Sequence, residues 1–147
     1  MKWQHLVVLA LIATATVGCT KEVNSNQADN QTPTNTNSAI AEIGNFQAGE
    51  HPTKGKAAIV TAEGQQYLEF DENFKTDNGP DLFVILYRTN KPPISGIKEQ
   101  DYVQVAPLKT VNGKQRYLVP QNIKLTDYKS VAIWCRKFNA TFGYAAL

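Results

Sequence analysis

A chain of 147 residues with 42% hydrophobic and 19% charged residues has the composition of one globular domain with an additional segment. Its formal net charge of +2 is too small to indicate binding to nucleic acid. No arginine-rich run or repeat of aromatic and basic residues supports that function either. We therefore expect no nucleic-acid partner.

Residues 1–18 have the pattern of a signal peptide for export. Lys2 supplies a positive start, residues 6–15 are apolar but too few to span a bilayer, and small residues follow. The segment ends in Thr-Val-Gly before Cys19, which resembles the lipobox of bacterial lipoproteins, where the cysteine is acylated on sulfur and becomes the new N-terminus. Thr16 departs from the usual leucine, and a plain signal peptide with a chance cysteine is the alternative.

Residues 19–38 are rich in Asn, Gln and Thr and contain almost no large apolar side chains. Such a segment buries too little surface to offset the entropy of ordering, so it is predicted to be a disordered linker. We therefore expect an extracytoplasmic protein, held by lipid to a bacterial membrane at its periplasmic face or at the cell surface. The folded domain is expected at residues 39–147.

From Ala39 onward, turn signals recur every eight to twelve residues without a helical apolar period, which predicts an all-β domain. Seven or eight short strands favour a small antiparallel β-sandwich, or a barrel-like sandwich. The strands are expected at 40–46, 56–61, 66–70, 82–87, 102–108 and 115–119, with two more separated by a short turn within 130–147.

The connections between these strands carry recognisable signals. Residues 62–65 predict a hairpin turn, and Asn112-Gly113 predicts a second hairpin between the strands at 102–108 and 115–119. The apolar run 82–87 predicts a central strand covered on both faces. Two prolines and a glycine make Asn90–Asp101 a long surface loop.

Alternation along the last two strands assigns their faces. Val131, Ile133 and Cys135 share one face of the first, and Phe142 and Tyr144 are expected to share a face of the second. The only other cysteine in the chain is Cys19. If Cys19 is lipidated, Cys135 has no disulfide partner although the compartment is oxidising.

The expected folded domain, residues 39–147, contains one histidine, His51, one cysteine, Cys135, and no methionine. This inventory excludes a blue-copper centre and a structural zinc site, so no metal site of those kinds is predicted. A thiol nucleophile activated by imidazole would need Cys135 beside His51, and nothing in their spacing requires this. A calcium site is a weaker alternative to ordinary turn chemistry for four acidic residues in one loop. They are Asp71, Glu72, Asp77 and Asp81.

One set of residues resembles a known family. The residues are Phe46, His51, Gly55, Asn78-Gly79-Pro80-Asp81-Leu82, Tyr117, Pro120, Tyr128, Val131, Ile133-Trp134-Cys135, Phe138, Phe142-Gly143 and Leu147. Together they resemble the DM-thirteen domain, a small module of Skeletor-type animal proteins that is also found in bacterial lipoproteins. The likeness covers nearly all of residues 39–147.

The resemblance implies a β-sandwich-like domain with a role in electron transfer or oxidative modification at the cell surface. It implies that Cys135 acts as a bare thiol or as the ligand of a prosthetic group such as haem, with His51 as the second ligand or proton partner. A protein redox partner would follow. The domain is not expected to be a stand-alone enzyme.

Two other functions stay open from the residues. The first is a non-enzymatic binding or adhesion module, in which Cys135 is a buried structural thiol and loops such as Asn90–Asp101 contact a partner. The second, weaker one is a thiol enzyme that uses Cys135 and His51.

Overall fold

The computed structural model describes residues 38–147, except for the side chains of residues 42 and 43. The predicted signal peptide, Cys19 and nearly all of the predicted linker lie outside the described residues. In the described part, no helix has the length and apolar character needed to cross a membrane.

Eight antiparallel strands form one continuous sheet in the described part of the chain. They are β1 (Ala39–Ala48), β2 (Lys56–Ala62), β3 (Gln65–Phe70), β4 (Leu82–Tyr87), β5 (Tyr102–Pro107), β6 (Gln115–Leu118), β7 (Ser130–Cys135) and β8 (Ala140–Ala146). Two short 3-10 turns, Glu99–Asp101 and Leu125–Asp127, are the helical elements of this part. The all-β prediction is confirmed.

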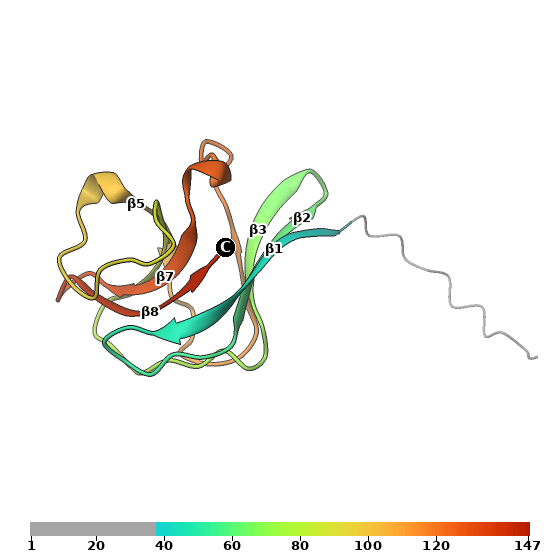
Figure 1. The fold of residues 1–147 in the computed structure, drawn as a ribbon. Coiled ribbons are helices and arrows are strands. Elements are labelled where there is room, and N and C mark those ends of the chain that lie inside the picture. Colours follow the sequence, from blue (N-terminus) through green and yellow to red (C-terminus); the bar gives the residue numbers. More distant parts are fainter. Residues whose placement is uncertain (1–37) are drawn as a thin grey trace, which may run out of the picture. The chain divides into compact units, whose positions relative to one another are not determined.

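The sheet rolls into a nearly closed barrel (Figure 1). Its strand order is β5-β4-β7-β8-β1-β2-β3-β6, and the two outermost strands, β5 and β6, approach each other without pairing. Rolling places one face of every strand inside the barrel. The apolar faces of the strands are therefore buried against one another without a second sheet. The barrel-like form of the predicted sandwich is therefore the one adopted.

The barrel interior is filled by aromatic and branched side chains that we name the interior cluster. It includes Phe46, Ile59, Leu68, Phe70, Phe74, Val84, Leu86, Tyr117, Val131, Ile133, Cys135 and Phe142. Phe46 and Phe70 meet edge to face with 5.0 Å between ring centroids, an arrangement that aromatic pairs prefer. This cluster is the main hydrophobic core.

A second cluster, the outer cluster, lies on the opposite face of β4, β7 and β8. It consists of Phe83, Ile85, Tyr87, Ile97, Ala132, Trp134 and Tyr144, with Tyr102 packed against it. Ile97 comes from the loop Asn90–Asp101, so this predicted surface loop covers the cluster with its inner side. Strands β4 and β7 are consequently buried on both faces, as the apolar run at 82–87 predicts.

Polar contacts from Asn139 hold the loop on the outer cluster. Trp134 Nε1 donates to Asn139 Oδ1 at 3.0 Å, and Asn139 Nδ2 donates to the Ile97 carbonyl at 3.1 Å. Thr141 adds a hydrogen bond from its hydroxyl to the Pro93 carbonyl at 2.7 Å. The inner side of the loop Asn90–Asp101, which the binding-module hypothesis assigns to a partner, is therefore used to cover the outer cluster.

The predicted hairpin between 102–108 and 115–119 is wrong. β5 pairs with β4, while β6 pairs with β3 at the other end of the sheet. Asn112 and Gly113 still form a turn, with Gly113 at φ +82°, but Gly113 N donates to the Phe74 carbonyl instead of closing a hairpin. Local turn chemistry predicted the bend correctly and the strand partner incorrectly.

The prediction that Phe142 and Tyr144 share a face is also wrong. Phe142 belongs to the interior cluster and Tyr144 to the outer cluster. The cause is a β-bulge: Ile133 pairs with Gly143 and Trp134 with Thr141, so Phe142 is the extra residue of β8. A bulge reverses the alternation beyond it.

Candidate functional site

Cys135 lies at the end of β7 and is completely buried, with 0% of its surface exposed. It pairs with Leu82 of β4 and Ala140 of β8, and its side chain belongs to the interior cluster. Cys135 lines none of five surface cavities that residues 38–147 form. Within this described part, Cys135 is a free thiol enclosed by the core.

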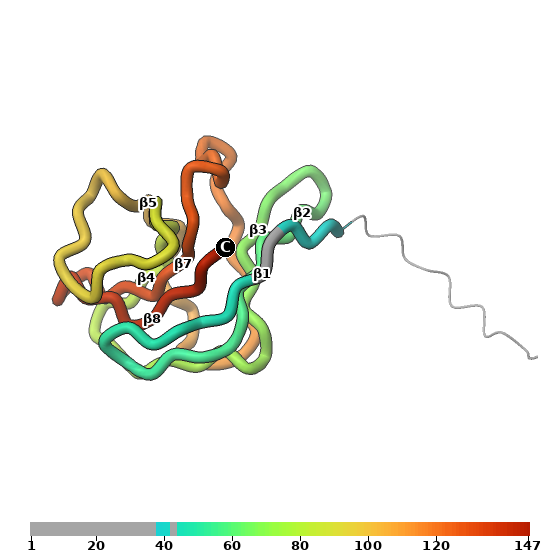
Figure 2. The backbone as a smooth tube through the Cα atoms, viewed as in Figure 1, coloured from blue at the N-terminus to red at the C-terminus, as the bar shows by residue number. Residues whose placement is uncertain are grey.

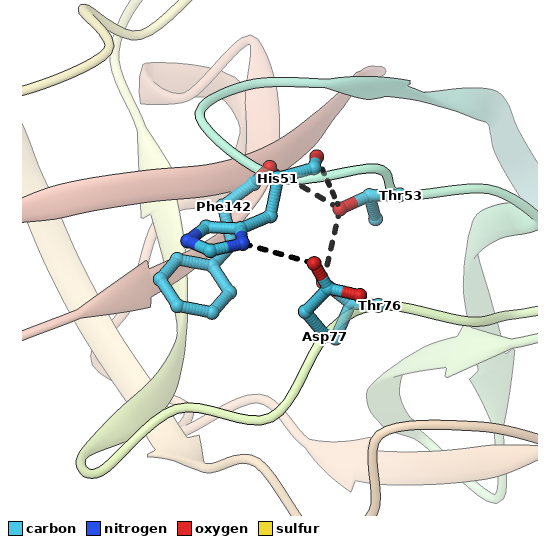
Figure 3. Close-up of polar contacts among 5 residues, drawn as sticks. All are labelled: His51, Thr53, Thr76, Asp77 and Phe142. Atoms are coloured by element: carbon cyan, nitrogen blue, oxygen red, sulfur yellow. Dashed lines mark hydrogen bonds and ion pairs between the residues drawn. The ribbon is translucent and has the colours of Figure 1, made fainter.

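His51 lies outside the interior cluster, in the loop of residues 49–55 that follows β1. Figure 2 traces this loop from the end of β1 along β8. The His51 side chain is 34% exposed, and its Nδ1 lies 3.0 Å from Asp77 Oδ2. The imidazole stacks on the ring of Phe142, with centroids 3.9 Å apart and an interplanar angle of 30° (Figure 3).

The backbone of this loop is held by the β-bulge of β8. The carbonyl of Phe142 accepts hydrogen bonds from Gly49 N at 2.9 Å, His51 N at 3.1 Å and Thr53 Oγ1 at 3.2 Å. The Thr53 hydroxyl also lies 3.0 Å from the Thr76 hydroxyl, beside Asp77 (Figure 3). The bulge that turns the Phe142 ring inward therefore also positions the loop that carries His51.

Gly143 makes this close approach feasible. A Cβ atom at this position would collide with the Cβ and Oγ1 atoms of Thr53. The absence of a side chain lets the loop pack directly on β8. Gly143 is therefore a packing requirement of the site.

The contact with Asp77 determines which imidazole nitrogen carries the proton. An ionised carboxylate only accepts hydrogen bonds, so Nδ1 of His51 is the donor, and in the neutral form of the ring Nε2 then has the free lone pair. Figure 3 shows Nε2 on the side of the ring away from Asp77, and no hydrogen bond to it occurs among residues 38–147. A carboxylate at one nitrogen and a free lone pair at the other is the arrangement of a metal-ligating histidine.

Cys135 and His51 do not form a pair. No hydrogen bond joins the thiol to the imidazole within residues 38–147, and the two side chains differ in environment, one in the core and one at the surface. Phe142 stacks on His51 and belongs to the same interior cluster as Cys135. The thiol enzyme hypothesis loses its geometric basis.

The acidic residues of the loop after β3 are dispersed. Asp71 accepts from Lys56 N, Asp77 from His51, and Asp81 forms an ion pair with Arg136 at 2.9 Å. In the described part, no three His, Cys, Asp or Glu side chains converge on a point that could hold a metal ion. The three aspartates are instead used in separate local contacts, and the geometry does not support the calcium alternative.

Sequence reasoning missed the role of Asp77 as the partner of His51. The two residues are 26 positions apart and belong to separate loops, and Asp77 was considered only for turn chemistry and calcium. The turn signal Asp77-Asn78-Gly79 predicts the bend but contains no information about which side chain the carboxylate reaches.

Comparison with known proteins gives one match. The sequence model of a family described as Electron transfer DM13 matches residues 45–147. This range includes β2 to β8 and the site residues His51, Asp77, Cys135 and Phe142. No curated protein and no solved structure matches the chain.

Proposed function

The chain belongs to the Electron transfer DM13 family, and on this premise we propose that its folded domain takes part in electron transfer outside the cytoplasm, anchored to a bacterial membrane by lipid on Cys19. The family match supports the electron-transfer role. The lipobox-like sequence before Cys19 supports the anchor and the export. A protein redox partner at the membrane surface follows from this role.

The geometry favours His51 over Cys135 as the residue that contacts the redox group. A thiol that exchanges electrons or ligates a group needs access, whereas Cys135 is completely buried. His51 offers an exposed, oriented nitrogen. In this proposal Cys135 is a structural thiol of the core.

The family resemblance implies haem as the redox group. It does not fit at Cys135, because the interior cluster is packed there and none of the five cavities adjoins the thiol. His51 would hold it through Nε2, because histidine is a usual protein ligand of haem iron. When bound, haem would supply one-electron chemistry at its iron.

In this proposal Asp77 and Phe142 orient the imidazole of His51. Asp77 keeps the proton on Nδ1 of His51 and so leaves the Nε2 lone pair available. Phe142 restrains the ring by stacking, and its carbonyl restrains the His51 backbone. The observation that carries the proposal is this single pre-oriented imidazole, held at Nδ1 and free at Nε2.

Titration of the full chain with haemin tests the ligand assignment. We expect a saturable shift of the Soret band in the wild type and in Cys135→Ala, and loss of the shift in His51→Ala. Asp77→Asn should weaken binding by about tenfold or more, since a partner of this kind orients the ligand. In the unprocessed chain, His5→Ala is the matched control, because His5, in the predicted signal peptide, is the other histidine of that chain.

A shift that persists in His51→Ala, a shift that disappears in Cys135→Ala, or no binding at all would overturn the assignment of His51. The anchor is tested separately. Mass spectrometry of the protein from bacterial membranes should find acyl chains on Cys19, and Cys19→Ser should move the protein to the soluble fraction.

A further inference from the structure

Two lysines lie directly opposite each other beside the site. Lys54 N donates to the Lys75 carbonyl at 2.9 Å, and Lys75 N donates to the Lys54 carbonyl at 3.0 Å, which makes an isolated antiparallel bridge. Side chains of such a pair leave on the same face, with Cβ atoms about 5 Å apart. Like charges in this position repel, and an anion between them would offset the repulsion.

Neither ammonium group is neutralised within the described residues. The ion pairs of residues 38–147 join His51 to Asp77, Arg116 to Glu69 and Arg136 to Asp81. Glu72 lines a neighbouring hollow together with both lysines but forms no ion pair with either. The two positive charges are therefore available to a ligand.

A cavity of about 420 Å³ adjoins the lysine pair. Its lining residues are Ala48, Pro52, Thr53, Lys54, Lys75 and Asp77. Ala48 and Pro52 give it an apolar wall, whereas the Asp77 carboxylate in the lining already accepts the hydrogen bond from His51. Two ammonium groups against one engaged carboxylate leave the cavity with a net positive charge.

This combination selects a class of ligand. A phosphate monoester carries a charge of about −1.5 to −2 near neutral pH and has three acceptor oxygens, which matches two ammonium donors. Lysine binds phosphate as a point charge and does not require planar geometry. The apolar wall leaves room for the organic part of a small ester.

We propose that this cavity, which we name the lysine pocket, binds the phosphoryl group of a phosphate monoester between Lys54 and Lys75. The proposal does not depend on the ligand role of His51. A free phosphate ester and a monoester lipid headgroup share this chemistry, and the experiment distinguishes the two sources.

Two probes are titrated into the full chain: glycerol 3-phosphate in solution, and vesicles of phosphatidic acid in phosphatidylcholine. Binding is measured by calorimetry, and backbone amide shifts locate it. Lys54→Gln and Lys75→Gln should each weaken binding roughly fivefold. Lys124→Gln is the matched control, an exposed lysine that lines none of the five cavities and should have no effect.

Saturable binding of glycerol 3-phosphate with shifts at Lys54 and Lys75 supports a free ester as the ligand. Binding of the vesicles alone, with the same dependence on both lysines, supports a lipid headgroup. No saturable binding of either probe, or equal weakening by all three substitutions, would overturn the lysine pocket. Haemin binding in the two pocket variants reports on His51 separately, so failure of one proposal is distinguishable from failure of the other.

Discussion

The imidazole of His51 stacks on the ring of Phe142, an interior side chain that a bulge in β8 turns toward the core. One aromatic residue thus connects the hydrophobic core to the exposed candidate ligand. The carbonyl of the same residue holds the loop in place through three hydrogen bonds. The site and the stability of the barrel are therefore coupled through Phe142.

Phe142→Leu should lower the free energy of unfolding by about 1–3 kcal/mol, because the smaller side chain leaves part of the core unfilled and loses the stacking contact. The measurement is urea denaturation. Phe138→Leu is the control, since Phe138 is 63% exposed and the same change there should cost less than about 0.5 kcal/mol. Equal effects of the two substitutions would contradict the interior position of Phe142.

Cys135 should resist alkylation until the protein unfolds, because its side chain is fully enclosed. The test is labelling with iodoacetamide with and without urea, followed by peptide mapping so that Cys19 is scored separately. Cys135→Ser should cost about 1–3 kcal/mol, since it buries a hydroxyl in an apolar environment, and Cys135→Ala should cost less. Rapid labelling of Cys135 in the native state would restore the reactive-thiol hypothesis.

Asn139 should be sensitive for two separable reasons. Its backbone has φ +48°, and its side chain joins Trp134 to the loop that covers the outer cluster. Asn139→Gly keeps the backbone relaxed but loses both hydrogen bonds, at a cost of about 1–3 kcal/mol. Asn139→Ala adds roughly 1 kcal/mol of backbone strain.

Urea unfolding followed by Trp134 fluorescence measures these differences, because Trp134 is the one tryptophan that remains once the predicted signal peptide is removed. The exposed Asn90 provides a control through Asn90→Ala, which should be nearly neutral. If Asn139→Gly were less stable than Asn139→Ala, the backbone part of the explanation would be wrong.

Stability should fall at alkaline pH because two buried tyrosines resist ionisation. Burial raises the pKa of Tyr117 above the ordinary value of 10.0, partly opposed by the hydrogen bond from the Lys109 amide. Burial also raises the pKa of Tyr87, with the nearby Asp101 carboxylate adding to the effect. The unfolded chain loses these protons first, so the stabilisation is fully present below pH 10 and is lost as the pH rises through the folded pKa values.

Urea midpoints between about pH 8 and about pH 11 measure this decline. Tyr117→Phe should make the decline shallower, although it should be less stable at neutral pH because Gln115 and the Lys109 amide lose their partner. A decline with unchanged steepness in Tyr117→Phe and in Tyr87→Phe would assign the alkaline loss to other groups.

Local properties of the chain were sufficient for the fold class. Alternating apolar residues, the continuous apolar run of β4 and the turn at Glu63-Gly64, where both residues have positive φ, are determined by neighbours along the chain. The same holds for the alternation of β7, which assigns Cys135 and Trp134 to opposite faces. The family resemblance, which depends on residue identity, is confirmed by the family match.

Which strands meet, and which side chains converge, depended on distant residues. β6 pairs with β3 and not with β5, and one bulged residue in β8 reverses the facing of Phe142. Thr53 reaches the Phe142 carbonyl across 89 residues, and His51 reaches Asp77 across 26. Closing a barrel brings loops together at its ends according to strand order, which alternation along a single strand does not encode.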